Sequence, residues 1–165
     1  MATDKIKKPY VIVLGNEKGG TGKSTLSMHV ITYLLKQNYK VASIDVDARQ
    51  GTLTRYVENR KNRIQTLKED LLIPEHRPIF RSTRDNVSEA ESEEKESINT
   101  AMNDFSDYDY VVFDTPGSDM HLSRFAHSFA DTLITPLNDS FIDLDMLVRL
   151  NSESLDIIKP STYSE

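Results

Sequence analysis

A short loop near the N-terminus, residues 17–25, gathers the side chains with the clearest chemical use. It holds nine candidate nucleotide-binding residues: Glu17, Lys18, Gly19, Gly20, Thr21, Gly22, Lys23, Ser24 and Thr25. The three glycines let successive backbone N–H groups turn inward and form a nest for an anion. Lys23 is long enough to reach the β- and γ-phosphates of a nucleotide, and the Ser24 hydroxyl is a ligand for Mg²⁺. The loop therefore predicts nucleotide-phosphate binding; the alternative is a flexible glycine-rich loop without a ligand.

Two regular elements must position this loop, and the sequence predicts both. Residues 9–15 form a continuous apolar run that ends in glycine, which is typical of a strand covered on both faces. Residues 24–37 place apolar side chains at helical spacing, among them Leu26, Val30 and Leu34. A helix that begins at the loop adds its positive N-terminal end to the nest.

Three aspartates stand at the ends of predicted strands. A strand over 41–45 ends in Asp45 with Asp47 just beyond it, and a strand over 108–113 is followed by Asp114. Taken singly, such a residue is usually a strand end or a helix cap. The carboxyl ends of parallel strands meet at the edge where α/β proteins bind ligands, so the three together favour a site. We expect Asp114 to hold Mg²⁺ through water, with Asp45 a candidate for the metal's outer shell.

The turn that follows Asp114 reads Asp-Thr-Pro-Gly and ends at Gly117. We expect the Gly117 N–H to contact the γ-phosphate of the nucleotide. No arginine stands out in the sequence as the residue that would neutralise charge on a transferring phosphoryl group.

Helix and strand alternate along the rest of the chain. A polar helix is expected over about 50–65, another helix near 119–130, and a fourth strand over 132–135. Short connections between alternating strands and helices are typical of an α/β domain. The sequence therefore predicts one domain over residues 1–165, with a mostly parallel sheet flanked by helices.

Charge is unevenly spread along the chain. Residues 54–84 carry eight Lys and Arg against four Asp and Glu, whereas residues 85–109 carry one Lys against nine acids. Two solvated faces would explain this, and so would a basic docking surface; composition leaves both open. We expect the acidic stretch 85–97 to be a mobile surface loop or a frayed helix start. Pro74 and Pro78 indicate a break between helices.

Composition excludes several classes of protein. The chain has 165 residues, no cysteine and a net charge of −6, so it holds no disulfide or thiolate zinc site. Its longest apolar run near the N-terminus, residues 10–14, is too short for a signal peptide or a membrane span. A cytoplasmic protein is expected.

Residues 18–24, Lys-Gly-Gly-Thr-Gly-Lys-Ser, resemble the deviant Walker A signature of the ParA/MinD family at every fixed position. The resemblance implies a P-loop NTPase that hydrolyses ATP slowly with Mg²⁺. It implies that Lys18 reaches across an ATP-dependent homodimer to the other subunit's phosphates, and that Asp47 orients the attacking water. Lys18, Lys23 and Asp47 would then be catalytic. Ser24, Asp47 and Asp114 would hold the metal, the aspartates through water.

The resemblance extends to the MipZ branch of that family. The similar segments are residues 45–50, 58–60, 114–117, 124–127 and 135–145. This branch regulates placement of the division site in concert with chromosome segregation, and the resemblance implies the same role here.

Partners follow from the same resemblance. They are a ParB-like centromere-binding protein, an FtsZ-like division protein and, for the dimer, DNA without sequence preference. The resemblance also implies that the protein is located at the cell poles or on the nucleoid. Arg49, Arg55, Arg60 and Lys61 are candidate contacts, although arginines on a polar helix are usually just solvated. No membrane-targeting helix is visible in residues 151–165.

Several alternatives stay open at this stage. A ParA-type partitioning ATPase shares the nucleotide motifs. A P-loop kinase for a small metabolite would need an acceptor pocket and no Lys18, and a fragment could bind nucleotide without hydrolysing it. The chain is shorter than is usual in the resembled family, so we expect the fold to be incomplete at the C-terminus.

Overall fold

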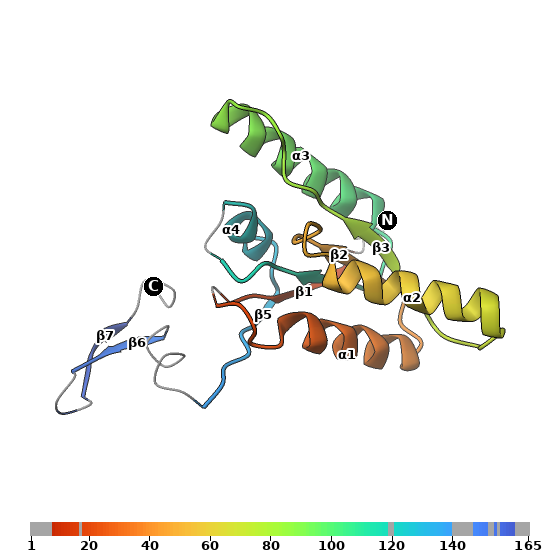
Figure 1. Ribbon diagram of the computed structural model, residues 1–165, viewed down its shortest axis with the longest axis horizontal. Coiled ribbons are helices and arrows are strands. Elements are labelled where there is room, and N and C mark those ends of the chain that lie inside the picture. The colour runs from red at the N-terminus through yellow and green to blue at the C-terminus, as the bar shows by residue number, and fades with distance from the viewer. Residues whose placement is uncertain are drawn as a thin grey trace, which may run out of the picture.

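The computed structural model describes residues 8–16, 18–118, 121–139, 147–151, 154 and 156–160. Its centre is a five-stranded sheet in the order β3-β2-β4-β1-β5, in which every pair of neighbours is parallel (Figure 1). The strands are β1 (Tyr10–Leu14), β2 (Val41–Asp45), β3 (Glu75–Pro78), β4 (Tyr110–Asp114) and β5 (Thr132–Ile134). The predicted α/β fold with a parallel sheet is confirmed.

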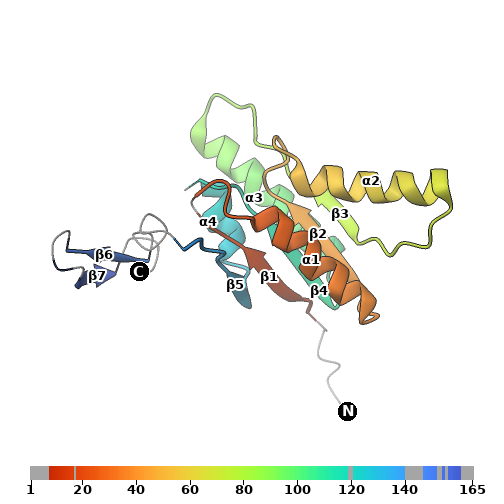
Figure 2. The same ribbon diagram turned by 60° about the horizontal axis from the view of Figure 1, so that its bottom comes forward.

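Helices cover both faces of this sheet, so its central strands are largely buried on both sides (Figure 2). The helices are α1 (Lys23–Lys36), α2 (Thr52–Leu67), α3 (Val87–Asp104) and α4 (His121–His127). Ile31 of α1 and Leu53 of α2 are buried together with Val112 of β4 on one face. Ile98 of α3 is buried with Phe113 of β4 on the other.

Alternate residues of one strand thus serve two cores. In β4, Val111 and Phe113 belong to the core under α3 and α4, whereas Val112 belongs to the core under α1 and α2. This alternation fixes the direction of each side chain at the strand ends, where the loops begin.

Of the two alternatives expected for the acidic stretch 85–97, a mobile loop or the start of a helix, the structure has the start of a helix. From Val87 onward the stretch is the first part of α3. The Asn86 side chain caps the helix by accepting hydrogen bonds from the N–H groups of Ser88 and Glu89. Acidic side chains near a helix N-terminus are favourable, and Arg84 pairs with Glu89 and Glu93 here.

Three strands were missed in the sequence. β3 contains His76 and Arg77 and ends in Pro78, so it lacks an apolar run; proline is tolerated because β3 is an edge strand. β6 (Val148–Leu150) and β7 (Ile157–Pro160) form a separate antiparallel pair, drawn apart from the sheet in Figures 1 and 2. None of the helices in the described part of the chain is long and apolar enough to cross a membrane.

Candidate functional site

The loops that follow β1, β2 and β4 meet at one edge of the sheet. Leu14 of β1 and Asp45 of β2 both pair with Asp114 of β4, so the three strands end at the same level. A cavity of about 600 Å³ opens there, lined by the glycine-rich loop, the start of α1, the segment after β2 and the turn after β4. This is the edge at which open α/β sheets bind ligands.

The glycine-rich loop has the backbone shape of an anion nest. Gly20 and Gly22 adopt φ values of +76° and +89°, which favour glycine over any other residue. A Cβ at Gly19, Gly20 or Gly22 would meet open space, since the cavity lies in front of them. α1 begins directly after Gly22 with no side-chain cap and no acidic residue in its first turn. Its first N–H groups are therefore available to an anion.

Most of the predicted loop residues line this cavity: Gly19, Gly20, Gly22, Lys23, Ser24 and Thr25. Thr21 does not line it, although it lies between them. Thr21 is buried, and its hydroxyl has no hydrogen-bond partner within the described part of the chain. Glu17 lies outside the described residues.

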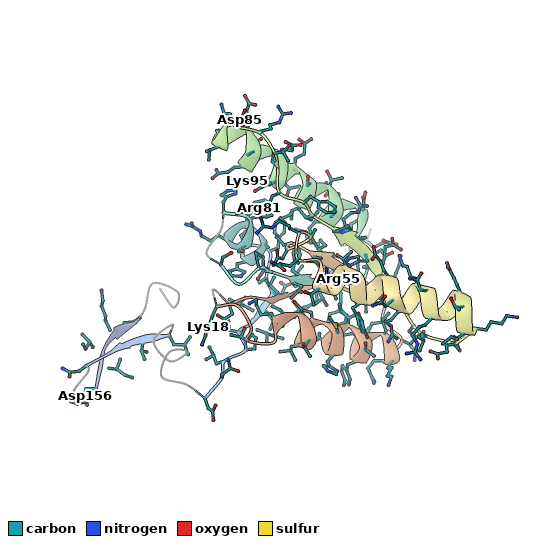
Figure 3. The ribbon with its side chains drawn as sticks, in the orientation of Figure 1. Lys18, Arg55, Arg81, Asp85, Lys95 and Asp156 are labelled. Carbon is teal, nitrogen blue, oxygen red and sulfur yellow. The ribbon has the colours of Figure 1, made fainter. Side chains whose placement is uncertain are left out.

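The Lys23 side chain folds back onto the glycine-rich loop from the start of α1. Its Nζ donates a hydrogen bond to the Lys18 carbonyl oxygen at 2.8 Å. Burial lowers the pKa of the Lys23 ammonium, while the nearby Asp114 and Asp47 carboxylates favour its charged form. The three side chains that the sequence placed in three different motifs are therefore close in space. Lys18 itself stands at the loop that precedes α1 (Figure 3).

Asp114 is the most strongly perturbed acid at this edge. Burial raises its pKa to about 6, while hydrogen bonds from the Ser24 and Ser27 hydroxyls favour the charged form. Ser27 Oγ lies 3.0 Å from Asp114 Oδ1. Ser24 and Asp114 together offer a hydroxyl and a carboxylate, the hard oxygen donors that Mg²⁺ prefers. No group of three or more His, Asp and Glu side chains that could hold a metal occurs among the described residues.

Asp47 and Asp45 have different surroundings. Asp47 lines the cavity; burial raises the pKa of its carboxyl, and a hydrogen bond from the Gln50 backbone opposes this. Asp45 is fully buried and does not line the cavity. Its carboxylate accepts from the Asp47 N–H at 3.0 Å, the Thr54 N–H at 3.0 Å and the Thr54 hydroxyl at 2.7 Å. Asp45 therefore anchors both ends of the segment that carries Asp47, a role that the sequence did not indicate.

The turn after β4 packs directly on the glycine-rich loop. A Cβ on Gly117 would lie 2.7 Å from both Cα and N of Gly19 and 2.8 Å from the Lys18 carbonyl carbon. Thr115 ties this turn to β1 through a hydrogen bond from its hydroxyl to the Leu14 carbonyl at 2.8 Å. Gly117 therefore lies against the glycine-rich loop, while its contact with the γ-phosphate stays a prediction.

Two residues of the site were missed. Asn16 is buried; its amide donates to the Pro136 carbonyl at 2.7 Å and its oxygen accepts from the Lys18 N–H at 2.8 Å, so it fixes the start of the loop. Arg81 lines the cavity from the loop after β3. Asn16 directly precedes the predicted loop, so its position in the sequence could have indicated that it belongs to the site. No motif near Arg81 in the sequence indicates that Arg81 lines the cavity.

The cavity is cationic although the chain as a whole is acidic. Its charged lining residues are Lys23, Arg49 and Arg81 against Asp47, in a chain whose net charge is −6. Arg60, another predicted surface contact, is engaged within the chain, where it donates to the Tyr56 hydroxyl and the Leu72 carbonyl. The positive charge is therefore concentrated where the backbone nest lies.

A family model described as ATPase MipZ matches residues 10–165. The chain belongs to the MipZ ATPase family. Among curated proteins, the chromosome partitioning protein ParA of Myxococcus xanthus is 24% identical over 169 residues, covering 90% of this chain and 59% of that protein. This chain therefore spans less than two thirds of the length of that relative.

Solved structures share the fold of this MipZ-family chain. A plasmid partition protein from Borrelia burgdorferi is 26% identical, with a TM-score of 0.56, over 84% of this chain and 71% of that one. The MinC:MinD cell division protein complex of Aquifex aeolicus matches at 22% identity with a TM-score of 0.53, over 82% and 59% of the two chains. The resemblance to the ParA/MinD family is thus confirmed.

Proposed function

We propose that this chain is the nucleotide-binding part of an ATP-dependent dimerisation switch, which hydrolyses ATP slowly with Mg²⁺. In this proposal it regulates division-site placement in concert with chromosome segregation, as its family suggests. The observation that supports it best is the cationic cavity of an acidic chain, built on an uncapped helix and a glycine nest.

Each residue of the site has a proposed part in binding. The N–H groups of residues 19–24 and the Lys23 ammonium bind the β- and γ-phosphates. Ser24 would ligate Mg²⁺ directly, and Asp114 and Asp47 would hold it through water. When bound, Mg²⁺ would supply positive charge to the phosphate oxygens. The Gly117 N–H contacts the γ-phosphate from the opposite side of the loop.

Hydrolysis transfers the γ-phosphoryl group to water. Asp47 accepts a hydrogen bond from the attacking water and orients it; a bond forms from the water oxygen to phosphorus, and the bond to the β–γ bridging oxygen breaks, giving ADP and phosphate. Burial raises the pKa of the Asp47 carboxyl, which makes this carboxylate a better hydrogen-bond acceptor for the water. Lys18 of a second copy supplies positive charge to the leaving phosphates, which makes turnover depend on dimerisation.

The partners are part of the same proposal. They are a homodimer formed with ATP, a ParB-like centromere-binding protein, an FtsZ-like division protein and non-specific DNA for the dimer. Arg49 and Arg55 remain candidate contacts at the start of α2, where Figure 3 marks Arg55.

Light scattering with ADP and then with ATP and Mg²⁺, alongside phosphate release, tests the switch. We expect a monomer with ADP, a dimer with ATP and slow release of phosphate. Lys18→Ala should lose both the dimer and hydrolysis, whereas Lys36→Ala, which removes an exposed lysine at the other end of α1, should lose neither. A metabolite kinase would keep its activity in Lys18→Ala, and a chain that stays monomeric and releases no phosphate would contradict the switch.

A further inference from the structure

The chain continues along the edge of the sheet beyond β3 and enters the cavity. The Ile79 N–H donates to the Asp45 carbonyl at 2.8 Å, which extends the pairing of β3 with β2. Residues 79–81 therefore run beside the segment that carries Asp47. Ile79 and Arg81 line the same cavity as the glycine-rich loop, and Arg81 is labelled between α3 and the strand ends in Figure 3.

The loop that carries Arg81 is fastened to α3 immediately after that residue. The Ser82 N–H donates to Glu94 Oε1 at 3.0 Å, and its hydroxyl donates to Glu93 Oε2 at 2.8 Å. Arg84 Nε also donates to Glu93 Oε2, at 3.0 Å. These contacts hold the backbone at Ser82, so Arg81 reaches the cavity from a fixed anchor.

The neighbours of Arg81 indicate which phosphate it meets. The glycine nest and the start of α1 supply one part of the cavity lining, and the segment that carries Asp47 supplies another, together with Ile79 and Arg81 that run beside it. If a diphosphate occupied the nest, the additional phosphate of a triphosphate would extend past Lys23 toward Asp47, whose carboxylate interacts with the Lys23 ammonium. Guanidinium groups bind phosphate oxygens through paired, charge-assisted hydrogen bonds.

We propose that Arg81 binds the terminal phosphate of ATP in its own subunit and thereby lets the chain distinguish ATP from ADP. This inference rests on the proposed function, because it requires that the cavity binds a nucleotide. It adds a contact from the chain's own subunit to the charge that Lys18 of a second copy supplies.

Equilibrium binding of ADP and of a non-hydrolysable ATP analogue, each with Mg²⁺, tests this assignment on the full chain kept dilute enough to remain monomeric. We expect Arg81→Ala to weaken the triphosphate about tenfold while ADP binding changes less than twofold. Arg81→Lys, which keeps the charge but not the paired donors, should fall between the wild type and Arg81→Ala. Arg63→Ala is the charge-matched control, since Arg63 pairs with Glu69 at the far end of α2.

Each result has a distinct meaning. Equal affinities of Arg81→Ala and the wild type for the triphosphate would overturn the assignment while leaving the proposed function standing. Equal losses for ADP and the triphosphate would also overturn it, because Arg81 would then act on the shape of the site. If the wild type bound neither nucleotide, the proposed function and this inference would fail together. Urea unfolding of each variant shows whether the fold is retained.

Discussion

At the scale of single residues, the fold buries one acidic side chain of the site, and this burial disfavours its charged form. Asp114 lies at 3% exposure, and burial raises the pKa of its carboxyl to about 6. Above that pH the folded chain carries a negative charge with little water around it, stabilised by the Ser24 and Ser27 hydroxyls and by the Lys23 ammonium. A bound cation would stabilise the charged carboxylate. Asp114 therefore favours ligand binding at the expense of the stability of the ligand-free protein.

Asp114→Asn should therefore stabilise the ligand-free protein at pH 7.5 by about 1–3 kcal/mol while abolishing metal-dependent nucleotide binding. The folded-state pKa lies above the unfolded one, so the cost of ionisation is absent below about pH 4 and complete above about pH 6. Urea unfolding at pH 7.5 and pH 4.5 should thus show a larger difference between variant and wild type at the higher pH. A variant less stable than the wild type at pH 7.5 would contradict the argument; Asp70→Asn, an exposed carboxyl on the loop after α2, serves as control.

Gly117 shows how closely two loops approach. Gly117→Ala places a methyl group against the backbone of Gly19, which can only move together with the phosphate loop. We expect at least tenfold weaker nucleotide binding and a loss of about 1–3 kcal/mol of unfolding free energy. Gly19→Ala, whose Cβ meets open space, should weaken binding with almost no loss of stability. Thermal unfolding of the two variants without ligand separates them, and equal melting temperatures would refute the packing argument.

At the scale of elements, a buried polar chain joins β2, α2 and β3. The Thr54 hydroxyl donates to Asp45 at 2.7 Å and lies 3.0 Å from His76 Nε2, while His76 Nδ1 lies 2.9 Å from the Ser43 hydroxyl. Since Thr54 has one proton and gives it to the carboxylate, His76 must donate through Nε2. Burial lowers the pKa of His76, in keeping with a neutral ring.

Thr54→Val removes the central link of this chain without changing the shape of the side chain. It leaves the His76 N–H without its acceptor and removes one of the two hydrogen bonds that Asp45 Oδ2 accepts from Thr54, so we expect a loss of about 1–3 kcal/mol in unfolding free energy. The same substitution at Thr66, which is exposed near the other end of α2, should change stability by less than about 0.5 kcal/mol. Urea unfolding at pH 7.5 measures both, and similar values for the two variants would show that the chain contributes little.

Local patterns predicted the elements whose sequences carry their own signals. The apolar runs of β1 and β4 and the glycines of the loop fall where they were expected, and Asp47 and Asp114 were located by the strand ends before them. Arg81 was missed because its place depends on β3, a polar edge strand that pairs with a segment 33 residues earlier. Contacts between distant parts of the chain, such as that of Asn16 with Pro136, produce no periodic pattern in the sequence and so cannot be predicted from one.

At the scale of the whole molecule, the cavity joins segments from most of the chain. Its walls come from the loops after β1, β2, β3 and β4, and they include Val46 and Ile79 of the core under α3 and α4. Binding to such a site opposes unfolding of the entire domain rather than of one loop.

Addition of ADP and Mg²⁺ at about one hundred times the dissociation constant should raise the unfolding free energy by about 2.7 kcal/mol. Lys23→Ala should lose this gain, because the ammonium that spans the loop is gone, whereas Lys36→Ala should keep it. Urea unfolding with and without ligand gives the result; the absence of any gain in the wild type would argue against nucleotide binding.

The common level at which β1, β2 and β4 end has a consequence for how related sequences can diverge. Leu14, Asp45 and Asp114 stand in line across the sheet, and successive residues alternate between its two faces. One residue inserted in β4 would turn Asp114 away from the glycine-rich loop and exchange the two cores along that strand. We therefore expect related chains to accept substitutions in these strands but no gaps, and to vary in length instead at residues 68–74, which connect α2 to β3 at the opposite edge of the sheet.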